Sequence, residues 1–539
     1  MFNQILEPVG TLGITVLVSL IPLAFLLFLL AGIRMTAWLA CLLAGILTIP
    51  LGVYVWHAPL GQTLRAYLYG SLQGTWVIDW ITFWGLIIFN TLVITGDFEK
   101  FRKWMVHHAT ADVRIQTIML AWAFGALLEG LVGFGYPWAV VAPILIGLGI
   151  ADLDAIRLAA LANNAPVSYG ALGSPILALA LVTGLPLLTL SGSVGNIVAV
   201  LALFPTWVLL YLASGWQGMI EAWPLAVVGS LSYVAGQWPI AHYWGPYLPD
   251  IGGALVSFWV LYVFVKIWKP KTIRGFGGAP INAAAANSST PEMDISAFHA
   301  WLPYLILLVV VGIWTGPWLP RYFHVNPPGY TVAKFSVAAI SSVTHKAALS
   351  AFVFNPLSGG TSILVSWLVM LLFLRPNGSQ IKQVFSKTFH QMWGALLVGF
   401  FIFGLAYTFV FTGMANSLAF GLSKIGPAFI VLAPILGWIG VALSGSNTST
   451  NAMFGPVQVA AGKLLNFPVL LLPSLGSVGA EVGKPVAPQT ASVGVSTTKF
   501  VRSEGAVIRH NMGWTFVILG YLILVGLLFY YVLPGVMQY

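Results

Sequence analysis

Residues 115–150 read IQTIMLAWAFGALLEGLVGFGYPWAVVAPILIGLGI, an almost uninterrupted apolar stretch in which Glu129 is the only acid. A bilayer core takes about 20 helical residues, so this stretch is too long for one crossing and too short for two. A Gly-rich sequence, Glu129-Gly-Leu-Val-Gly-Phe-Gly-Tyr-Pro137, lies in its middle. This pattern is typical of a re-entrant hairpin, which is tolerated at membrane depth only where protein or a wet cavity surrounds it.

A second stretch, residues 427–460, has the same intermediate length and carries Ser444-Gly-Ser-Asn-Thr-Ser-Thr-Asn451 at its centre. Each predicted hairpin is followed by an apolar segment that proline interrupts, residues 153–175 and residues 467–489. Two halves of opposite topology with such elements are typical of secondary transporters. We therefore predict an all-α polytopic membrane protein with two inverted-topology repeats, each containing a re-entrant helical hairpin and a broken transmembrane helix.

The composition supports a membrane protein. Of 539 residues, 59% are hydrophobic and 7% are charged, whereas soluble domains carry about 25% charged residues. A soluble enzyme, a nucleic-acid-binding protein and a disordered chain are therefore excluded, and the lipid bilayer is the expected surrounding. The single cysteine, Cys41, excludes an intramolecular disulfide framework and a Cys-based zinc site.

The remaining apolar runs are long enough to predict further spans. The first run has no Lys or Arg before it, unlike a cleaved signal peptide, so we interpret it as a retained span. The predicted spans are residues 9–33, 35–55, 75–95, 190–213, 219–240, 249–268, 299–318, 361–374, 391–412 and 510–533.

The distribution of basic residues predicts the orientation. With both termini outside, the first hairpin opening to the cytoplasm and the second to the outside, 16 of the 23 Lys and Arg residues are cytoplasmic and 6 are outside. The positive-inside rule favours this threading. It divides the chain into a first half at 1–268, a cytoplasmic linker at 269–298 and a second half at 299–539.

Two acids and one base at membrane depth suggest ion coupling. Glu129 has no Lys or Arg within its own hairpin, and a buried acid is costly to keep charged, so we predict that it carries the proton. The alternative is a structural acid capped by backbone amides. Lys484 is the one base left at depth, and Glu481 lies three residues before it. Either Glu481 neutralises Lys484 permanently, or an anionic substrate shares the ammonium; Glu481 is thus the second, less favoured candidate for proton coupling.

Polar side chains at the second tip and around the proline breaks predict the substrate site. A half-helix end offers unpaired N–H groups and a positive dipole end, which suit a carboxylate. The alternative is close packing of small residues. The predicted substrate-binding residues are Asn164, Ser168, Tyr169, Ser446, Asn447, Thr448, Ser449, Asn451, Lys484 and Gln489. Asp79, in a Trp-rich span, is interpreted as an interfacial or structural acid.

At these motifs the chain resembles the lactate permease family of bacterial and archaeal carriers. Residues 125–137 and 164–175 are similar to the family's first hairpin and broken helix, and residues 444–454 and 482–489 to the second pair. The resemblance runs in order from about residue 9 to 533. It implies symport of protons with L-lactate or a similar 2-hydroxymonocarboxylate, such as glycolate or D-lactate, across a bacterial or archaeal plasma membrane.

The chain departs from the family pattern at several positions. Asn447 stands where the second hairpin of the family usually has an acid, and Glu481 is an acid that the family pattern does not predict. Tyr136 and Trp138 stand where smaller residues are usual. These departures suggest a relocated proton site, a changed substrate or weak coupling.

We therefore expect a secondary transporter that symports protons with a small organic anion. No nucleotide-binding loop or metal-ligand spacing is recognisable, so no cofactor and no metal are expected, and a proton gradient supplies the energy. The alternatives are a sodium-coupled carrier of another organic anion or dicarboxylate, a membrane-embedded enzyme and a channel. The enzyme would need a catalytic acid pair or metal cluster, and opposed hairpins disfavour the channel.

Overall fold

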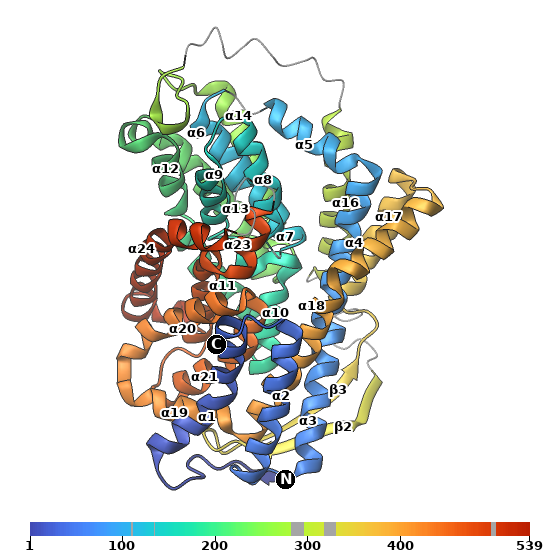
Figure 1. Cartoon of the computed structure of the whole chain (residues 1–539), viewed down its shortest axis with the longest axis vertical. Helices are drawn as coiled ribbons and strands as arrows, with labels where there is room; N and C mark the ends of the chain where they lie inside the picture. Colours follow the sequence, from blue (N-terminus) through green and yellow to red (C-terminus); the bar gives the residue numbers. More distant parts are fainter. Residues whose placement is uncertain are drawn as a thin grey trace.

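The computed structural model describes residues 1–108, 111–133, 135–281, 296–316, 330–496, 498 and 503–538. The chain is predominantly helical, with helices running along the long axis of the molecule (Figure 1). In the first half the helices are α1 (Leu12–Leu27), α2 (Ala37–Tyr54), α3 (Leu60–Gln73), α4 (Trp80–Thr95), α5 (Asp97–His108), α6 (Val113–Gln116), α7 (Gly125–Leu131), α8 (Tyr136–Gly147), α9 (Asp152–Ala162), α10 (Gly170–Thr183), α11 (Leu187–Leu201), α12 (Pro205–Glu221), α13 (Trp223–Tyr243) and α14 (Pro249–Ile267). In the second half they are α16 (Ala297–Thr315), α17 (Gly359–Leu374), α18 (Gly378–Thr412), α19 (Met414–Leu422), α20 (Phe429–Ser444), α21 (Asn447–Leu464), α22 (Leu471–Gly483), α23 (Pro488–Val495) and α24 (Glu504–Tyr531).

Short π- and 3₁₀-helical segments extend or connect these helices. The π-helical segments are η1 (Phe28–Gly32), η2 (Gly74–Asp79) and η3 (Thr117–Phe124). The 3₁₀ segments are η4 (Val167–Tyr169), η5 (Phe276–Gly278), η7 (Ser423–Ala428), η8 (Lys484–Val486) and η9 (Pro534–Met537).

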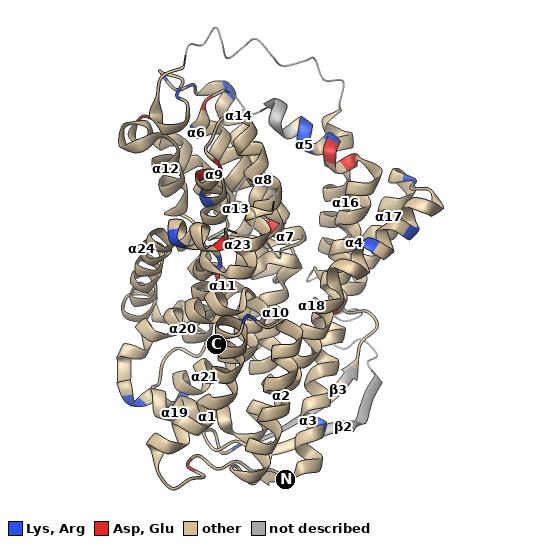
Figure 2. Cartoon of the chain, in the orientation of Figure 1, with Lys and Arg blue, Asp and Glu red and all other residues tan. Residues whose placement is uncertain are grey.

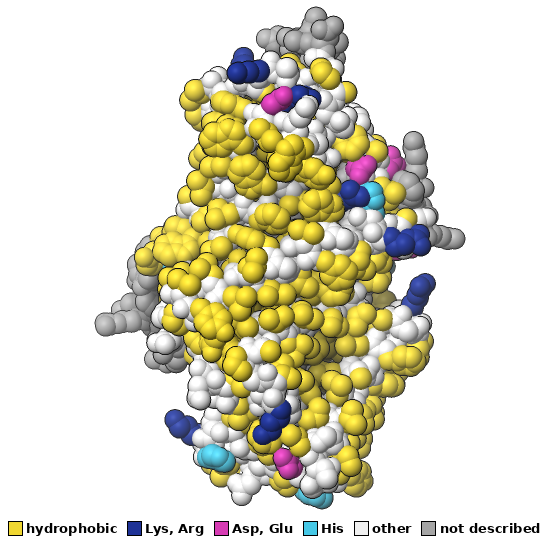
Figure 3. Space-filling view, turned by 90° about the vertical axis from the view of Figure 1, so that its left-hand side faces the viewer, with side chains coloured by type: hydrophobic (Ala, Val, Ile, Leu, Met, Phe, Trp, Pro, Cys, Tyr) yellow, Lys and Arg dark blue, Asp and Glu magenta, His cyan; other side chains and the backbone are white. Residues whose placement is uncertain are grey.

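The length and hydropathy of the helices identify a membrane protein. Among the described residues, nine helical stretches are long and apolar enough to cross a membrane, or ten if α9 and the following η4–α10 segment form one bent span. Figure 3 shows hydrophobic side chains over most of the middle of one face, with charged side chains toward the ends and one edge. The prediction of a helical multi-pass membrane protein is therefore confirmed. The inverted relation of the two halves and the orientation of the termini stay predictions.

Glycine, serine and proline end the helices where the sequence predicts hairpin tips and breaks. Gly445, in the left-handed region at φ 73°, ends α20, and Ser446 begins α21 by accepting a hydrogen bond from the backbone N–H of Ser449. In the first stretch, Gly133 and Gly135 adopt φ 66° and 79° between α7 and α8. The axis bends by 66° between α9 and the segment that begins at Val167.

A small sheet is the one feature of the fold that the all-α prediction does not include. Strand β1 (Phe2–Asn3) pairs in parallel with β2 (Tyr330–Ile340), and β2 pairs antiparallel with β3 (Ala347–Phe354). This sheet lies at the same end of the molecule as the N-terminus (Figure 1). Strands β2 and β3 belong to the connection between α16 and α17, whereas β1 precedes α1, and the helical class of the protein is unchanged.

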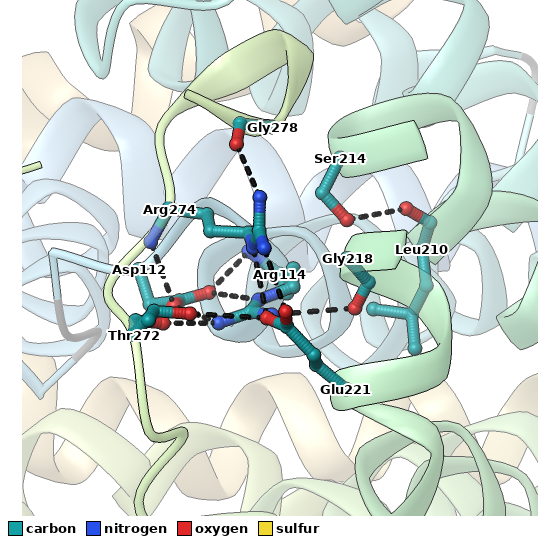
Figure 4. Close-up of polar contacts among 9 residues, drawn as sticks. All are labelled: Asp112, Arg114, Leu210, Ser214, Gly218, Glu221, Thr272, Arg274 and Gly278. Carbon is teal, nitrogen blue, oxygen red and sulfur yellow. Dashed lines mark hydrogen bonds and ion pairs between the residues drawn. The ribbon is translucent and has the colours of Figure 1, made fainter. Parts of the chain in front are cut away.

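Lys and Arg residues are more frequent at the opposite end of the molecule (Figure 2). A buried ionic cluster lies there (Figure 4), centred on Arg114, whose side chain is fully buried. Arg114 Nη2 lies 2.6 Å from Asp112 Oδ2, and its Nη1 lies 3.2 Å from Glu221 Oε2. Arg274 Nη2 contacts Glu221 Oε1 at 2.6 Å. The cluster joins the start of α6, the end of α12 and the segment after α14, where the predicted linker begins; residues 282–295 of that linker lie outside the described residues.

Candidate functional site

The two hairpin tips meet around a small cavity. Gly133 of the first tip and Gly445 of the second both line it, together with residues of the broken helix at 163–175. Its volume is about 40 Å³, where one water needs about 10–15 Å³. The full lining is Glu129, Gly133, Val167, Gly170, Ala171, Ser174, Pro175, Gly445, Ser446, Asn447, Thr448 and Lys484.

A buried ion pair forms part of the cavity wall. Lys484 Nζ lies 2.5 Å from Glu129 Oε1, and the two side chains are 6% and 2% exposed. Asn163 Nδ2 donates a hydrogen bond to Glu129 Oε2 at 3.1 Å, so both carboxylate oxygens have a donor. Glu129 lies in the last turn of α7, and Lys484 begins the 3₁₀ turn that follows α22. The pair therefore links the two halves of the chain, since 355 residues separate its members.

This pairing is one that the sequence did not indicate. The sequence left two partners open for Lys484, a local pair with Glu481 or a shared anionic substrate, and it showed only that the hairpin of Glu129 contains no Lys or Arg. The structure instead directs Glu481 toward the first broken helix, where its Oε2 accepts a hydrogen bond from Ser168 Oγ at 2.5 Å. Its Oε1 is buried and has no hydrogen-bond partner among the described residues. The spacing of three residues permits a local contact, but the tertiary fold gives each group a nearer partner from the other half.

Glycine keeps space for the carboxylate of Glu129. A Cβ atom at Gly170 would lie 2.6 Å from Glu129 Oε1, and one at Gly133 would lie 3.1 Å from the Cβ of Ala171. The glycines that the sequence places at the tip and after the break therefore allow the backbone to approach the ion pair closely.

A larger cavity adjoins the small one. The two share Ser174, Gly445, Ser446 and Thr448, and the larger has a volume of about 380 Å³. Parts of α1, α2, η2, α4 and α18 form one side of it, and the second hairpin and α23 form the other. An ion pair at the tips and a wider cavity beside it give a small anion both a binding point and a space to approach it.

The structure distributes the predicted binding residues over three environments. Ser446, Asn447, Thr448 and Lys484 line the small cavity, and Ser449 and Gln489 line the larger one. The side-chain amide of Asn447 is buried and has no hydrogen-bond partner among the described residues.

The other four predicted residues lie in the packing behind the cavities. Tyr169 donates its hydroxyl to the carbonyl of Ser191 at 2.6 Å, and Ser168 donates to Glu481. Asn451 donates to the carbonyl of Pro175 and the hydroxyl of Ser477, both at 2.9 Å. Asn164 is fully buried, and its amide atoms have no partner among the described residues.

The sequence did not indicate that two further acids, Asp250 and Asp79, lie at this site. Asp250, in the first turn of α14, is 1% exposed and accepts a hydrogen bond from the Tyr233 hydroxyl at 2.9 Å. It packs beside the backbone that carries Glu129, because a Cβ atom at Gly130 would lie 2.7 Å from the Asp250 Cβ. The position of Asp250 next to Pro249 in an apolar run was the feature of the sequence that could have indicated it. Asp79, interpreted from the sequence as an interfacial or structural acid, is buried and lines the larger cavity.

A helical multi-pass chain with a buried ion pair, polar hairpin tips and adjoining cavities belongs to the class of membrane transporters for small polar solutes. The comparisons with known proteins specify the family. A family model described as L-lactate permease matches residues 15–533, so the chain belongs to the L-lactate permease family.

Three relatives illustrate the relationship. The chain is 33% identical to the glycolate permease GlcA of Escherichia coli K12, with 99% of each chain covered. It is 30% identical to the L-lactate permeases of E. coli K12 and Bacillus subtilis 168, with 95% of each chain covered in both cases. Among solved structures, the YdaH transporter of Alcanivorax borkumensis aligns at a TM-score of 0.42 and 15% identity, covering 91% of this chain and 88% of that one.

Proposed function

We propose that this permease is a proton-coupled symporter of L-lactate or a similar 2-hydroxymonocarboxylate, such as glycolate or D-lactate, in a bacterial or archaeal plasma membrane. The names of the relatives support the substrate class. The buried Glu129–Lys484 pair in the wall of the cavity between the tips is the observation that carries the proposal.

The pair suggests how proton and substrate are coupled. A carboxylate substrate needs a cation at depth, and Lys484 is already neutralised by Glu129. When Glu129 takes up a proton on Oε1, its attraction to the ammonium falls, and the substrate carboxylate replaces it at Lys484 Nζ. One anion and one proton then move together, and the protein moves with its ammonium neutralised in both states. An ammonium left without a partner would be costly to bury.

The second tip provides the remaining contacts. Asn447 has an unused donor and acceptor in its amide, which can bind the 2-hydroxyl group and one carboxylate oxygen of the substrate. The hydroxyls of Ser446 and Thr448 lie in the same wall. Buried polar groups are normally hydrogen-bonded, so the unpartnered amide supports a ligand at this place.

Transport into proteoliposomes tests the proposal. Labelled lactate, glycolate and a dicarboxylate are offered under a pH gradient and, separately, under a sodium gradient. We expect lactate or glycolate to accumulate under the pH gradient alone. Accumulation that requires sodium, or that favours the dicarboxylate, would establish the alternative carrier class.

The Glu129→Gln variant tests the coupling. Gln resembles the protonated acid and cannot release a proton, so uphill uptake is expected to disappear while counterflow of substrate remains. Glu99→Gln is the matched control, because Glu99 lies on α5 with a side chain that is 45% exposed. If Glu129→Gln accumulates substrate and Glu481→Gln does not, the proton is carried by Glu481. If both variants accumulate it, the proposed coupling fails.

A further inference from the structure

Asp79 is a buried acid that the proposed transport step does not use. It is the last residue of the π-helical segment η2 and is 6% exposed. It lines the larger cavity, which Ser446 and Thr448 of the second tip also line. π-helical segments are rare and often mark functional positions.

Within the described part of the chain, the carboxylate of Asp79 has no neutralising contact. Its Oδ2 is buried with no hydrogen-bond partner among the described residues. The hydroxyl of Thr82, one turn later, donates to the backbone carbonyls of Ile78 and Asp79 instead. Gly399 of α18 provides the space for this acid, because a Cβ atom there would overlap both carboxylate oxygens.

The elements packed around η2 do not provide a counter-ion. Helices α4, α10 and α17 contain no charged or titratable side chain. Arg65 of α3 and Lys382, Lys387 and His390 of α18 are exposed, and none of them lines the larger cavity. Tyr67 and Tyr69 of α3 and Tyr407 of α18 pack elsewhere: the Tyr67 ring lies against Gly45 and Gly404, Tyr69 packs edge-on against Tyr407, and Tyr407 donates to the carbonyl of Leu181. Among the residues that line the larger cavity, Cys41 is the only other titratable side chain.

We propose that Asp79 is a second proton-binding acid of this permease, and that it must be protonated for an anionic substrate to pass through the larger cavity. This inference rests on the proposed function, since it takes the substrate to be an anion that reaches Lys484 through this cavity. An ionised Asp79 would repel that anion, and the repulsion would be strong because the cavity wall has a low dielectric constant. The neutral acid would leave an O–H donor facing the same path. Asp79 would thus set the pH dependence of substrate movement, whereas Glu129 would set the coupling.

The test separates the effects of Glu129 and Asp79 by replacing Glu129 in every variant. Counterflow of labelled lactate is measured against pH, with equal pH on both sides, in Glu129→Gln and in Glu129→Gln/Asp79→Asn. We expect counterflow in the single variant to fall about tenfold per pH unit on the alkaline side, as for one titrating group. The double variant is expected to give a flat profile. Asp97→Asn in the Glu129→Gln background is the control, because Asp97 lies outside the spans and pairs with Lys100. Identical profiles of the single and double variants would overturn the proposal.

Protonation of Asp79 can also be measured directly, which keeps the proposal testable if the Asp79 variants do not transport substrate. Infrared difference spectra of the wild-type protein between acid and alkaline pH are expected to contain a protonated carboxyl band that is absent in Asp79→Asn and in Asp79→Ser. If the band is unchanged in both variants, Asp79 does not exchange protons. If added sodium at constant pH removes the band or replaces protons in restoring counterflow, the site binds a metal cation and the proposal is wrong. Loss of pH-driven accumulation in the wild type would instead refute the proposed function, whichever result the spectra give.

Discussion

A double-mutant cycle on the ion pair tests the architecture of the site most directly. Lys484 and Glu129 are in contact at 2.5 Å and almost fully buried, whereas Glu481, closer in sequence, bonds to Ser168. The cycle combines Glu129→Gln, Lys484→Met and the double variant. A parallel cycle replaces Glu129→Gln by Glu481→Gln. The structure predicts strong coupling in the first cycle and clearly weaker coupling in the second.

The expected magnitudes follow from burial. Removing one member of a buried pair leaves the other charge without compensation and costs about 3–5 kcal/mol. The Glu129→Gln/Lys484→Met variant contains neither charge, so it is expected to lose far less than the sum of the single losses. The coupling energy is therefore expected to be at least about 1.5 kcal/mol. The coupling in the Glu481 cycle is expected to be clearly smaller, because Glu481 and Lys484 interact electrostatically without forming an ion pair.

The free energies come from reversible unfolding in mixed micelles, with helical circular dichroism as the signal. All variants are compared in the same detergent and lipid, because both change the folded and the unfolded state. Additive effects of Glu129→Gln and Lys484→Met, with coupling between Glu481→Gln and Lys484→Met, would refute the geometry described above. The substrate site would then have to be rebuilt around a local pair.

Two further predictions concern other polar groups. Arg114→Met is expected to destabilise the protein by about 3–5 kcal/mol, because it leaves the buried Asp112 carboxylate without the guanidinium. Lys100→Met, in an exposed pair, is expected to change stability by less than about 0.5 kcal/mol. Equal losses of the two variants in unfolding experiments would contradict the conclusion that the Arg114–Asp112 pair is buried and stabilising. Asn447→Ala is expected to raise the KM for uptake about tenfold with little change in stability. Asn451→Ala is expected to lose stability instead, since that amide is already hydrogen-bonded. If Asn447→Ala lost stability and Asn451→Ala raised the KM, the substrate would not bind at Asn447.

The sequence predicts those features that depend on local chemistry. Apolar length alone establishes the multi-pass class, and Gly445 and Ser446 end one helix and start the next through their own conformational and capping preferences. The strands at Tyr330–Ile340 and Ala347–Phe354 were not predicted, because a segment between two predicted spans is expected to be a loop. Their β-branched and aromatic residues were the available signal.

Contacts between segments far apart in the chain could not be predicted from local sequence patterns. Spacing on one helix suggested that Lys484 pairs with Glu481, but no periodicity indicates that residue 129 lies beside residue 484. The same limit applies to Asp79, whose Trp neighbours suggested a membrane interface. Its position beside the larger cavity became evident only from the structure, where Gly399 of another helix makes room for the carboxylate.

The charges around the small cavity support the proposal that a proton accompanies the substrate. Glu129, Glu481 and Asp250 interact electrostatically with one another and with Lys484, the one base that lines the cavity among the described residues. Three carboxyl groups thus share one ammonium, and an anionic substrate would add a further negative charge to a region where uncompensated charge is costly. A proton on Glu129 cancels that added charge at the atom that the substrate displaces. Under the proposed function, one proton is taken up for each monocarboxylate before the anion reaches Lys484, and it is released after the anion leaves.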